Sequence, residues 1–321
     1  MRVCIVGAGG LGTVLAGFLS RAGAEVTLLV RPAHAAAYEA PRVRVEAPEP
    51  FEAPVRLASS SDGVGAFDYL LLCVKGRDTE AALAPLARLD VATALSFQNG
   101  MKKNDALLRL FGRKRVIGAA TMVGGELLRP GCSRLMSTGA TLLGELDGSV
   151  APRAERLAAA FNAAGLPAAA VPQIVTREWQ KLVTYLSGAL VCALTRTDMA
   201  ASLLHPELAR TRLRLSREVA AIAAAEGHPL GSLPVILNAA AVRPGLAPEL
   251  PGFDAADGAI LGAYAGQGRA LRAQGAVVYP SLLQDMAAGR PTELEDTAGD
   301  ALLRAARHAV PAPALQTCTE L

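Results

Sequence analysis

The stretch that decides the fold spans residues 2–12 and reads RVCIVGAGGLG. Its apolar start is typical of a buried strand, and the glycines that follow fit the pattern G-x-G-x-x-G. In such a turn the first glycine permits a tight bend, the second lets the backbone approach a pyrophosphate, and the third lets the next helix pack on the strand. A glycine-rich turn also occurs for structural reasons alone, but its place between a strand and a helix predicts dinucleotide binding. The residues of this turn are Gly7, Ala8, Gly9, Gly10, Leu11 and Gly12.

Short apolar runs alternate with helical patterns over the first half of the chain. We expect strands at 2–6, 25–30, 69–74 and 94–97, and helices at 11–22, 78–89 and 151–164. Alternation of this kind implies crossover connections and a mainly parallel sheet. The runs at 115–119 and 141–143 are expected to extend the same sheet.

The pattern changes near residue 170 and becomes helical. Thr176 is expected to cap a helix with Glu178 in its first turn, followed by leucines at every fourth position from 182 to 194. We therefore predict an α/β protein, with an N-terminal Rossmann-type dinucleotide-binding domain over 1–171 and an all-α substrate and catalytic domain over 172–321. The stretch 243–252, rich in proline and glycine, is expected to be a loop, and whether it closes over a ligand is left open.

Composition excludes several classes of protein. A chain of 321 residues that is 51% hydrophobic and 19% charged is neither disordered nor a coiled coil. The net charge is only +3, and the densest run of basic residues (113–115) is typical of a solvated loop. Aromatic residues, which would stack on bases, make up only 4% of the chain. We therefore expect no nucleic-acid partner. No apolar run reaches the roughly 20 residues that a bilayer span needs. Five scattered cysteines without C-x-x-C predict neither disulfides nor a metal site, and a cytoplasmic location is the simplest expectation.

Three residues at expected strand ends are candidates for cofactor binding, because ligands of open α/β sheets lie outside the carboxyl ends of the strands. Arg31 stands where a carboxylate would bind the ribose of NAD, and its guanidinium suits the 2′-phosphate of NADP(H), although it can equally be an ordinary surface arginine. Lys75 follows the third strand. Asn99 follows the next one, and although Asn-Gly is by default a turn signal, its amide could donate to both a nicotinamide ribose and a substrate.

Lys181 is the most informative residue of the helical half. Only five of the 32 basic residues are lysines, and unlike arginine a partly buried lysine can release its proton. The alternative is a lysine whose ammonium reaches the surface at a helix start. On a helical wheel one polar-to-small face, suited to a pocket floor, holds Lys181, Thr184, Tyr185, Gly188, Ala189 and Cys192.

The C-terminal region predicts two short helices. The first begins at Ser281 and stops at Gly289, and Thr292 with Glu295 forms a capping box that places Glu293 in the first turn of the second. Glu293 there can simply complement the helix dipole. None of the four histidines falls at these positions, which disfavours a histidine-based hydride transfer.

Taken together, these residues resemble the ketopantoate reductase (2-dehydropantoate 2-reductase) family over nearly the whole chain. The block 281–293, SLLQDMAAGRPTE, is similar to the family pattern S-M-x-Q-D-x-x-x-x-R-x-T-E, and the segments 73–75, 98–100 and 179–182 match as well. The resemblance implies an NADP-dependent oxidoreductase that reduces a small 2-oxo acid, foremost 2-dehydropantoate to pantoate in pantothenate biosynthesis. A homodimer is left open.

The resemblance also implies roles for single residues. Lys181 would protonate the ketone oxygen, and Glu293 would organise substrate and cofactor. Ser281 would bind the substrate carboxylate, with Asn99 bridging substrate and cofactor. The cofactor would be held by Arg31 and Lys75, with Gly125 lining its nicotinamide side.

This chain departs from the family pattern at three positions. Where the family has asparagines, it has Tyr185, Ala189 and Val278. Tyr185 is therefore expected in a less polar substrate site. Two alternatives stay open: a D-2-hydroxyacid dehydrogenase of this family for another branched or aromatic 2-oxo acid, and a non-catalytic NADP(H)-binding sensor.

Overall fold

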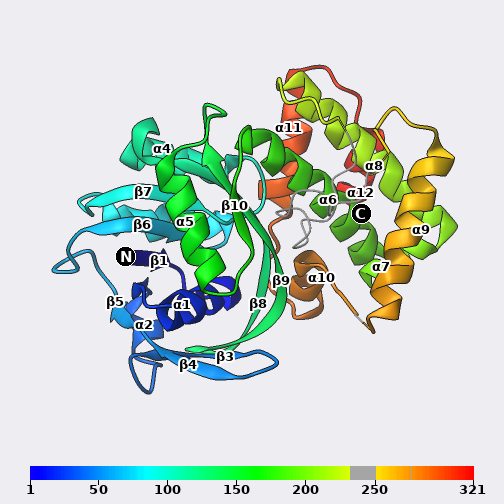
Figure 1. Ribbon diagram of the computed structural model, residues 1–321. Coiled ribbons are helices and arrows are strands. Elements are labelled where there is room, and N and C mark those ends of the chain that lie inside the picture. The colour runs from blue at the N-terminus through cyan, green and yellow to red at the C-terminus, as the bar shows by residue number, and fades with distance from the viewer. Residues whose placement is uncertain (232–250, 276) are drawn as a thin grey trace. The chain divides into compact units, whose positions relative to one another are not determined.

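The computed structural model describes residues 1–231, 251–275 and 277–321 (Figure 1). The described residues form two compact units, the first made of 1–98 and 102–175, the second of 99–101, 176–231, 251–275 and 277–321. Most of the loop expected at 243–252 lies outside the described residues. In the part of the chain that the structure describes, no helix has both the length and the apolar character of a membrane span.

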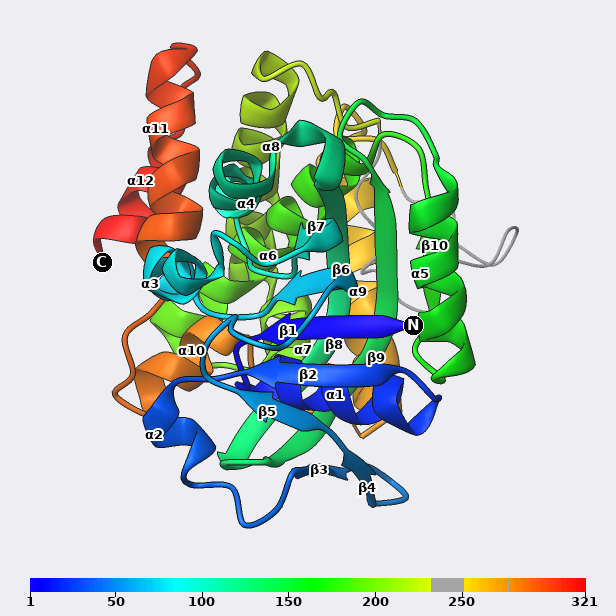
Figure 2. The same ribbon diagram turned by 90° about the vertical axis from the view of Figure 1, so that its left-hand side faces the viewer.

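The first unit is built on a parallel five-stranded sheet of order β5-β2-β1-β6-β7. The strands expected at 2–6, 25–30, 69–74 and 94–97 are confirmed, with ends shifted by up to three residues. Figure 2 looks onto this sheet, with β1 at its centre. The strands are β1 (Arg2–Val6), β2 (Glu25–Leu29), β5 (Arg56–Ala58), β6 (Phe67–Leu72) and β7 (Val91–Ser96).

The expected extension of this sheet by 115–119 and 141–143 is confirmed only by a single parallel bridge between Val116 and Ala94 of β7, and is otherwise wrong. These runs belong to the long antiparallel hairpin of β8 (Ile117–Arg129) and β9 (Cys132–Glu145), which reverses at Gly131 in a left-handed conformation (φ +75°). With β10 (Ala168–Ala170), β3 (Arg42–Glu46) and β4 (Phe51–Pro54) the hairpin forms a second sheet. A short apolar run predicts a strand but not its partner, because the partner is chosen by the turn that follows.

Helix α1 (Gly10–Arg21) packs between the two sheets and is buried from Gly12 to Leu19. One core joins Leu15 of α1 with Ile5 of the parallel sheet, Leu143 of the second sheet and Phe161 of α5 (Pro152–Ala163). The helices expected at 11–22 and 151–164 are thus confirmed. Shorter helices cover the other face of the parallel sheet: α3 (Thr79–Leu83), followed by a 3₁₀ turn at Ala84–Leu86, and α4 (Asp105–Phe111). The helix expected at 78–89 is therefore shorter than predicted, since Pro85 cannot donate to a continuing helix.

The second unit is helical throughout its described residues. Its longest helix, α6 (Ile174–Thr195), begins two residues before Thr176, directly after Gln173 in the left-handed region (φ 53°). Thr176 is thus not the cap that we expected, and its hydroxyl is instead hydrogen-bonded to Nδ1 of His228 (3.2 Å). The remaining helices are α7 (Met199–Leu204), α8 (Pro206–Ala225), α9 (Asp257–Ala273), α10 (Ser281–Ala287), α11 (Asp300–Arg307) and α12 (Pro313–Glu320).

The glycine turn yields a test of packing that needs no ligand. A Cβ at Gly12 would overlap the carbonyl oxygen of Gly7, whereas a Cβ at Gly9 would meet nothing within 4 Å. We expect Gly12→Ala to lower the free energy of unfolding by about 1–3 kcal/mol. Gly9→Ala should stay within about 0.5 kcal/mol of wild type. Urea unfolding without dinucleotide measures both, and equal midpoints for the two variants would contradict this packing.

Candidate active site

Three of the four glycines in the turn between β1 and α1 lie directly against other parts of the backbone or a side chain, and only Gly9 does not. Gly7 has φ +100° and donates its N–H to the carbonyl of Leu29 (3.0 Å). A Cβ at Gly10 would overlap the carbonyl of Gly125 in β8, and a Cβ at Gly125 would overlap that of Gly10, so the start of α1 lies directly on the β8 backbone. Gly9 alone faces open space. The turn therefore fits a diphosphate. Such a group binds where backbone N–H groups can come close to it and where the N-terminus of a helix is held in a fixed position.

The other predicted cofactor residues of the first unit follow the carboxyl ends of parallel strands and so share one edge of the sheet. Arg31 comes after β2, is exposed, and precedes the short helix α2 (Pro32–Ala35) as its N-cap residue. Lys75 comes after β6 and is partly buried. Gly7 follows β1 at the same edge. The geometry thus brings the glycine turn, Arg31 and Lys75 to one edge of one sheet.

Two polar residues of this edge were not singled out from the sequence. Gln98 is buried, and its amide donates to the carbonyl of Val74 (2.9 Å) and to the Thr79 hydroxyl (2.6 Å), which ties together the segments that follow β6 and β7. Lys103 is only 6% exposed, and its amine donates to the Ala119 carbonyl in β8. The rarity of lysine, which drew attention to Lys75 and Lys181, applies equally to Lys103 and could have found it.

In the second unit, Asn99 and Glu293 are held together although 194 positions separate them. Nδ2 of Asn99 donates to Oε2 of Glu293 over 3.2 Å, and Glu293 is 9% exposed. Gly100, with φ +86°, lies so close to Asp296 that a Cβ would overlap its carbonyl oxygen. The Asn-Gly turn is therefore fixed against the 293–297 segment, and the geometry joins two of the predicted site residues.

The expected capping box at Thr292 is wrong. Helical structure begins at Leu294 and continues as a π turn (Glu295–Gly299) into α11, so Glu293 precedes the first turn rather than lying in it. The Glu293 carbonyl accepts a hydrogen bond from the Thr297 hydroxyl (2.7 Å). Single π turns are frequent at functional sites, and here one follows directly after a buried carboxylate.

Tyr185 and Ser281 form a second pair in the same unit. Ser281 lies close enough to the Tyr185 hydroxyl to affect its pKa, and it is the exposed first residue of α10. Burial raises the pKa of Tyr185 well above its ordinary value of 10.0, and the charge of Glu293 raises it further. Ser281 lowers the pKa of Tyr185, and Asp285 adds a smaller increase. Lys181, partly buried, lies one helical turn before Tyr185 on the same side of α6.

The expected pocket floor along α6 is shorter than predicted. Ala189 and Cys192 are fully buried, and a Cβ at Gly188 would lie 2.8 Å from Cε of Met199 in α7. Only the first turn of this face, with Lys181, Thr184 and Tyr185, keeps partial exposure. The remaining positions of this face are covered by other residues of the unit, because small residues such as Gly and Ala leave room for a neighbouring helix as well as for a ligand.

Val278 is held next to Met199, which covers this face at Gly188. Its side chain is exposed, and its carbonyl accepts a hydrogen bond from the backbone N–H of Met199 (2.9 Å). Of the three departures from the family pattern, Tyr185 is thus the one whose pKa is affected by other predicted site residues, Glu293 and Ser281.

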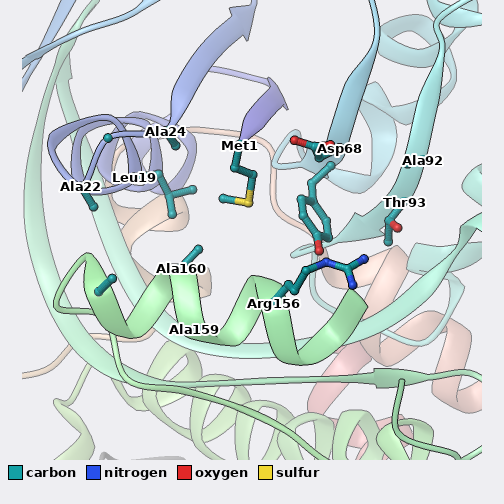
Figure 3. A pocket seen from close by; sticks show the side chains of 13 residues that line it. Met1, Leu19, Ala22, Ala24, Asp68, Ala92, Thr93, Arg156, Ala159 and Ala160 are labelled. Carbon is teal, nitrogen blue, oxygen red and sulfur yellow. The ribbon is translucent and has the colours of Figure 1, made fainter. Parts of the chain in front are cut away.

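A surface hollow of about 530 Å³ lies at the opposite edge of the parallel sheet, where its strands begin. Figure 3 shows it between Met1 next to the start of β1, the residues Asp68 and Thr93, and α5, which carries Arg156. Six alanines line it, and none of the predicted site residues does. We therefore do not assign the active site to this hollow.

Comparison with known proteins identifies relatives over the full length. The model of the family "Ketopantoate reductase PanE/ApbA" matches residues 3–148, and that of its C-terminal part matches 173–321. The chain is 26% identical to the 2-dehydropantoate 2-reductase of Halobacterium salinarum, covering all of this chain and 97% of the relative. It is 28% identical to that of Mesorhizobium japonicum, covering 92% and 88%.

Solved structures agree with this relationship. A PanE/ApbA family ketopantoate reductase from Ralstonia eutropha JMP134 superposes with a TM-score of 0.77 at 26% identity, over all of this chain and 96% of the other. A D-mandelate dehydrogenase bound to NADH and anilino(oxo)acetate has a TM-score of 0.80 over the same shares, but at 20% identity it shows the fold alone. Since the two family models together match most of the chain, it belongs to the ketopantoate reductase family, whose members are NADP-dependent oxidoreductases that act on CH–OH groups.

Proposed function

We propose that this protein reduces the keto group of a 2-oxo acid to a 2-hydroxy acid with NADPH, and that 2-dehydropantoate, which gives pantoate, is the first candidate substrate. The observation that carries the proposal is the contact between Asn99 and Glu293 in the helical unit. The amide of Asn99 donates to the buried Glu293 carboxylate, whose charge also acts on Tyr185, one turn after Lys181. Family membership supplies the reaction class.

Lys181 is the proton donor in this proposal. Bound NADPH supplies a hydride to the keto carbon, and negative charge then develops on the keto oxygen. An ammonium stabilises that charge and can release a proton to it, which an arginine cannot do near neutral pH. Ser281 donates a hydrogen bond to the substrate carboxylate. Glu293 holds the Asn99 amide in one orientation, so that Asn99 can contact substrate and cofactor together.

The first unit holds the cofactor in this proposal. The open side of Gly9 and the helix start at Gly10 suit the diphosphate, and Gly125 lies beside Gly10. Arg31, exposed at the end of β2, supplies a guanidinium for the 2′-phosphate. Lys75 follows β6 at the same sheet edge.

A second candidate function has one observation in its favour. Tyr185 occupies a position where an amide would favour a hydroxylated substrate, and burial raises the pKa of its hydroxyl, so the site around it is less polar. This supports a D-2-hydroxyacid dehydrogenase of the same family for another branched or aromatic 2-oxo acid.

The cytoplasmic location and the homodimer considered from the sequence remain predictions.

The function is tested by steady-state turnover of a panel of 2-oxo acids with NADPH and NADH in parallel. We expect reduction of at least one 2-oxo acid, with NADPH preferred. Tight NADPH binding without turnover of any acid would favour the sensor alternative and overturn the proposal.

Replacing the proton donor should separate catalysis from binding. We expect Lys181→Ala to lower kcat by about 10²–10⁴-fold, because general acid catalysis is lost, with the Kd of NADPH unchanged within about twofold. Lys114→Ala, which removes an exposed lysine of the first unit, is the matched control and should behave as wild type. Fluorescence titration and stopped-flow reduction measure the two quantities. A Lys181→Ala enzyme with full kcat would rule out this role.

Replacing Arg31 should change the choice of dinucleotide. A charge-assisted hydrogen bond contributes about 1.5–3 kcal/mol, so Arg31→Ala should reduce the NADPH:NADH ratio of kcat/KM by about 10–100-fold. NADH kinetics should hardly change, because NADH lacks the 2′-phosphate. Arg88→Ala, at another exposed arginine of this unit, serves as control. An equal loss with both dinucleotides would mean that Arg31 supports the fold instead.

A further inference from the structure

Arg212 of α8 is a buried arginine without a carboxylate partner. The residue is only 2% exposed, and among the described residues no carboxylate is paired with it. Asp198, the N-cap residue of α7, is paired instead with Arg272 (2.9 Å). Burial accordingly lowers the pKa of the Arg212 guanidinium. A buried charge of this kind is costly, because it has lost its water without gaining an opposite charge.

The groups that surround the guanidinium are weak partners for a cation. Nη1 donates to the Ser202 hydroxyl (2.7 Å) and to the thioether sulfur of Met199 (2.8 Å), both in α7. The guanidinium carbon lies 5.6 Å from the ring centre of Tyr264 in α9. A thioether is a weak acceptor, and a ring face attracts a cation much less than a carboxylate does. These neighbours therefore hold Arg212 in position but do not neutralise its charge.

The two hydrogen bonds leave one edge of the guanidinium unused. Nε has no hydrogen-bond partner among the described residues. Both bonds of the side chain start from Nη1, so Nη2 donates to none of these residues either. The N–H of Nε and one N–H of Nη2 point in the same direction, and such an edge binds a carboxylate through two parallel hydrogen bonds. The unused edge of Arg212 therefore fits a carboxylate group.

Nη2 of this edge lies next to a position of α6 that has no side chain. A Cβ on Gly188 would lie 3.3 Å from Nη2 of Arg212 and 2.8 Å from Cε of Met199. The Met199 side chain thus occupies the space beside Gly188. Methionine is unbranched and flexible, so this side chain can rotate and make room for a small group. Gly188 lies two helical turns after Lys181 on the same side of α6.

We propose that Arg212 is the binding site of a small carboxylate, held by Nε and Nη2 in the space beside Gly188. The ligand supplies the negative charge that the described neighbours of Arg212 lack. This carboxylate belongs either to a free anion or to the far end of a 2-oxo dicarboxylic acid. The site itself does not depend on the proposed function, and only the second of these sources does.

Binding is tested by thermal unfolding of the full chain in sodium acetate and in sodium chloride at equal ionic strength. A ligand that binds only the folded state raises Tm by mass action, so acetate should raise the Tm of wild type above its value in chloride by about 2 °C or more. Arg212→Met, which keeps an unbranched side chain without the charge, should lose this rise. Arg212→Lys should lose most of it, because an ammonium lacks the edge with two parallel N–H groups.

The same helix provides a matched control. Arg214 is two positions further along α8 and is exposed, so Arg214→Met should keep the full response to acetate. An equal rise of Tm in wild type, Arg212→Met and Arg212→Lys would show that acetate acts on the protein in general. No rise in wild type would show that the edge of Arg212 does not bind a carboxylate. Either result overturns the proposal, and if one Arg212 variant does not fold, the other decides.

The source of the carboxylate is tested by steady-state kinetics with NADPH and two acids, 2-oxoglutarate and 2-oxopentanoate, which differ only in the second carboxylate. If the site binds the substrate, the KM of wild type should be about tenfold or more lower for 2-oxoglutarate, and Arg212→Met should lose this difference. Equal KM values together with the response of Tm to acetate would assign the site to a free anion. A response to acetate without turnover of any 2-oxo acid would overturn the proposed function and leave the site intact.

Discussion

The first unit depends on a set of backbone contacts too close for any side chain. Gly12 lies against the Gly7 carbonyl, and Gly10 and Gly125 lie against each other. These contacts join β1, α1 and β8 at one point, and the core around Leu15 and Phe161 holds them there. Because the approach is between backbones, larger residues at these positions would separate the helix from both sheets.

Several polar interactions of the second unit involve one buried residue, Glu293. Glu293 receives a hydrogen bond from Asn99, accepts another at its carbonyl from Thr297, and its charge raises the pKa of Tyr185. A buried carboxylate is costly unless it is hydrogen-bonded, so these neighbours have to be arranged around it. The π turn that follows belongs to the same arrangement, because Asp296 within it meets Gly100.

Local sequence signals predicted the fold well and the details of the site only in part. The glycine turn and the parallel strands were predictable because they rest on spacing within a few residues. The β8–β9 hairpin was assigned to the wrong sheet, because strand pairing depends on a turn at Gly131 that the apolar runs do not contain. The capping box failed because a hydroxyl at Thr297 and a π turn replaced the ordinary helix start. The Asn99–Glu293 bond joins positions 194 residues apart, and no local pattern contains it.

The burial of α1 has a consequence for how a ligand would meet this protein. Eight consecutive residues of the helix, Gly12 to Leu19, are buried, so it is covered on every side over more than two turns. Such an element has no solvent-facing side on which to pivot or fray, and its amides should be among the last to exchange with deuterium. The helix N-terminus is therefore already in place before a nucleotide binds. Binding there should cost little conformational entropy, because the chain does not have to become ordered first.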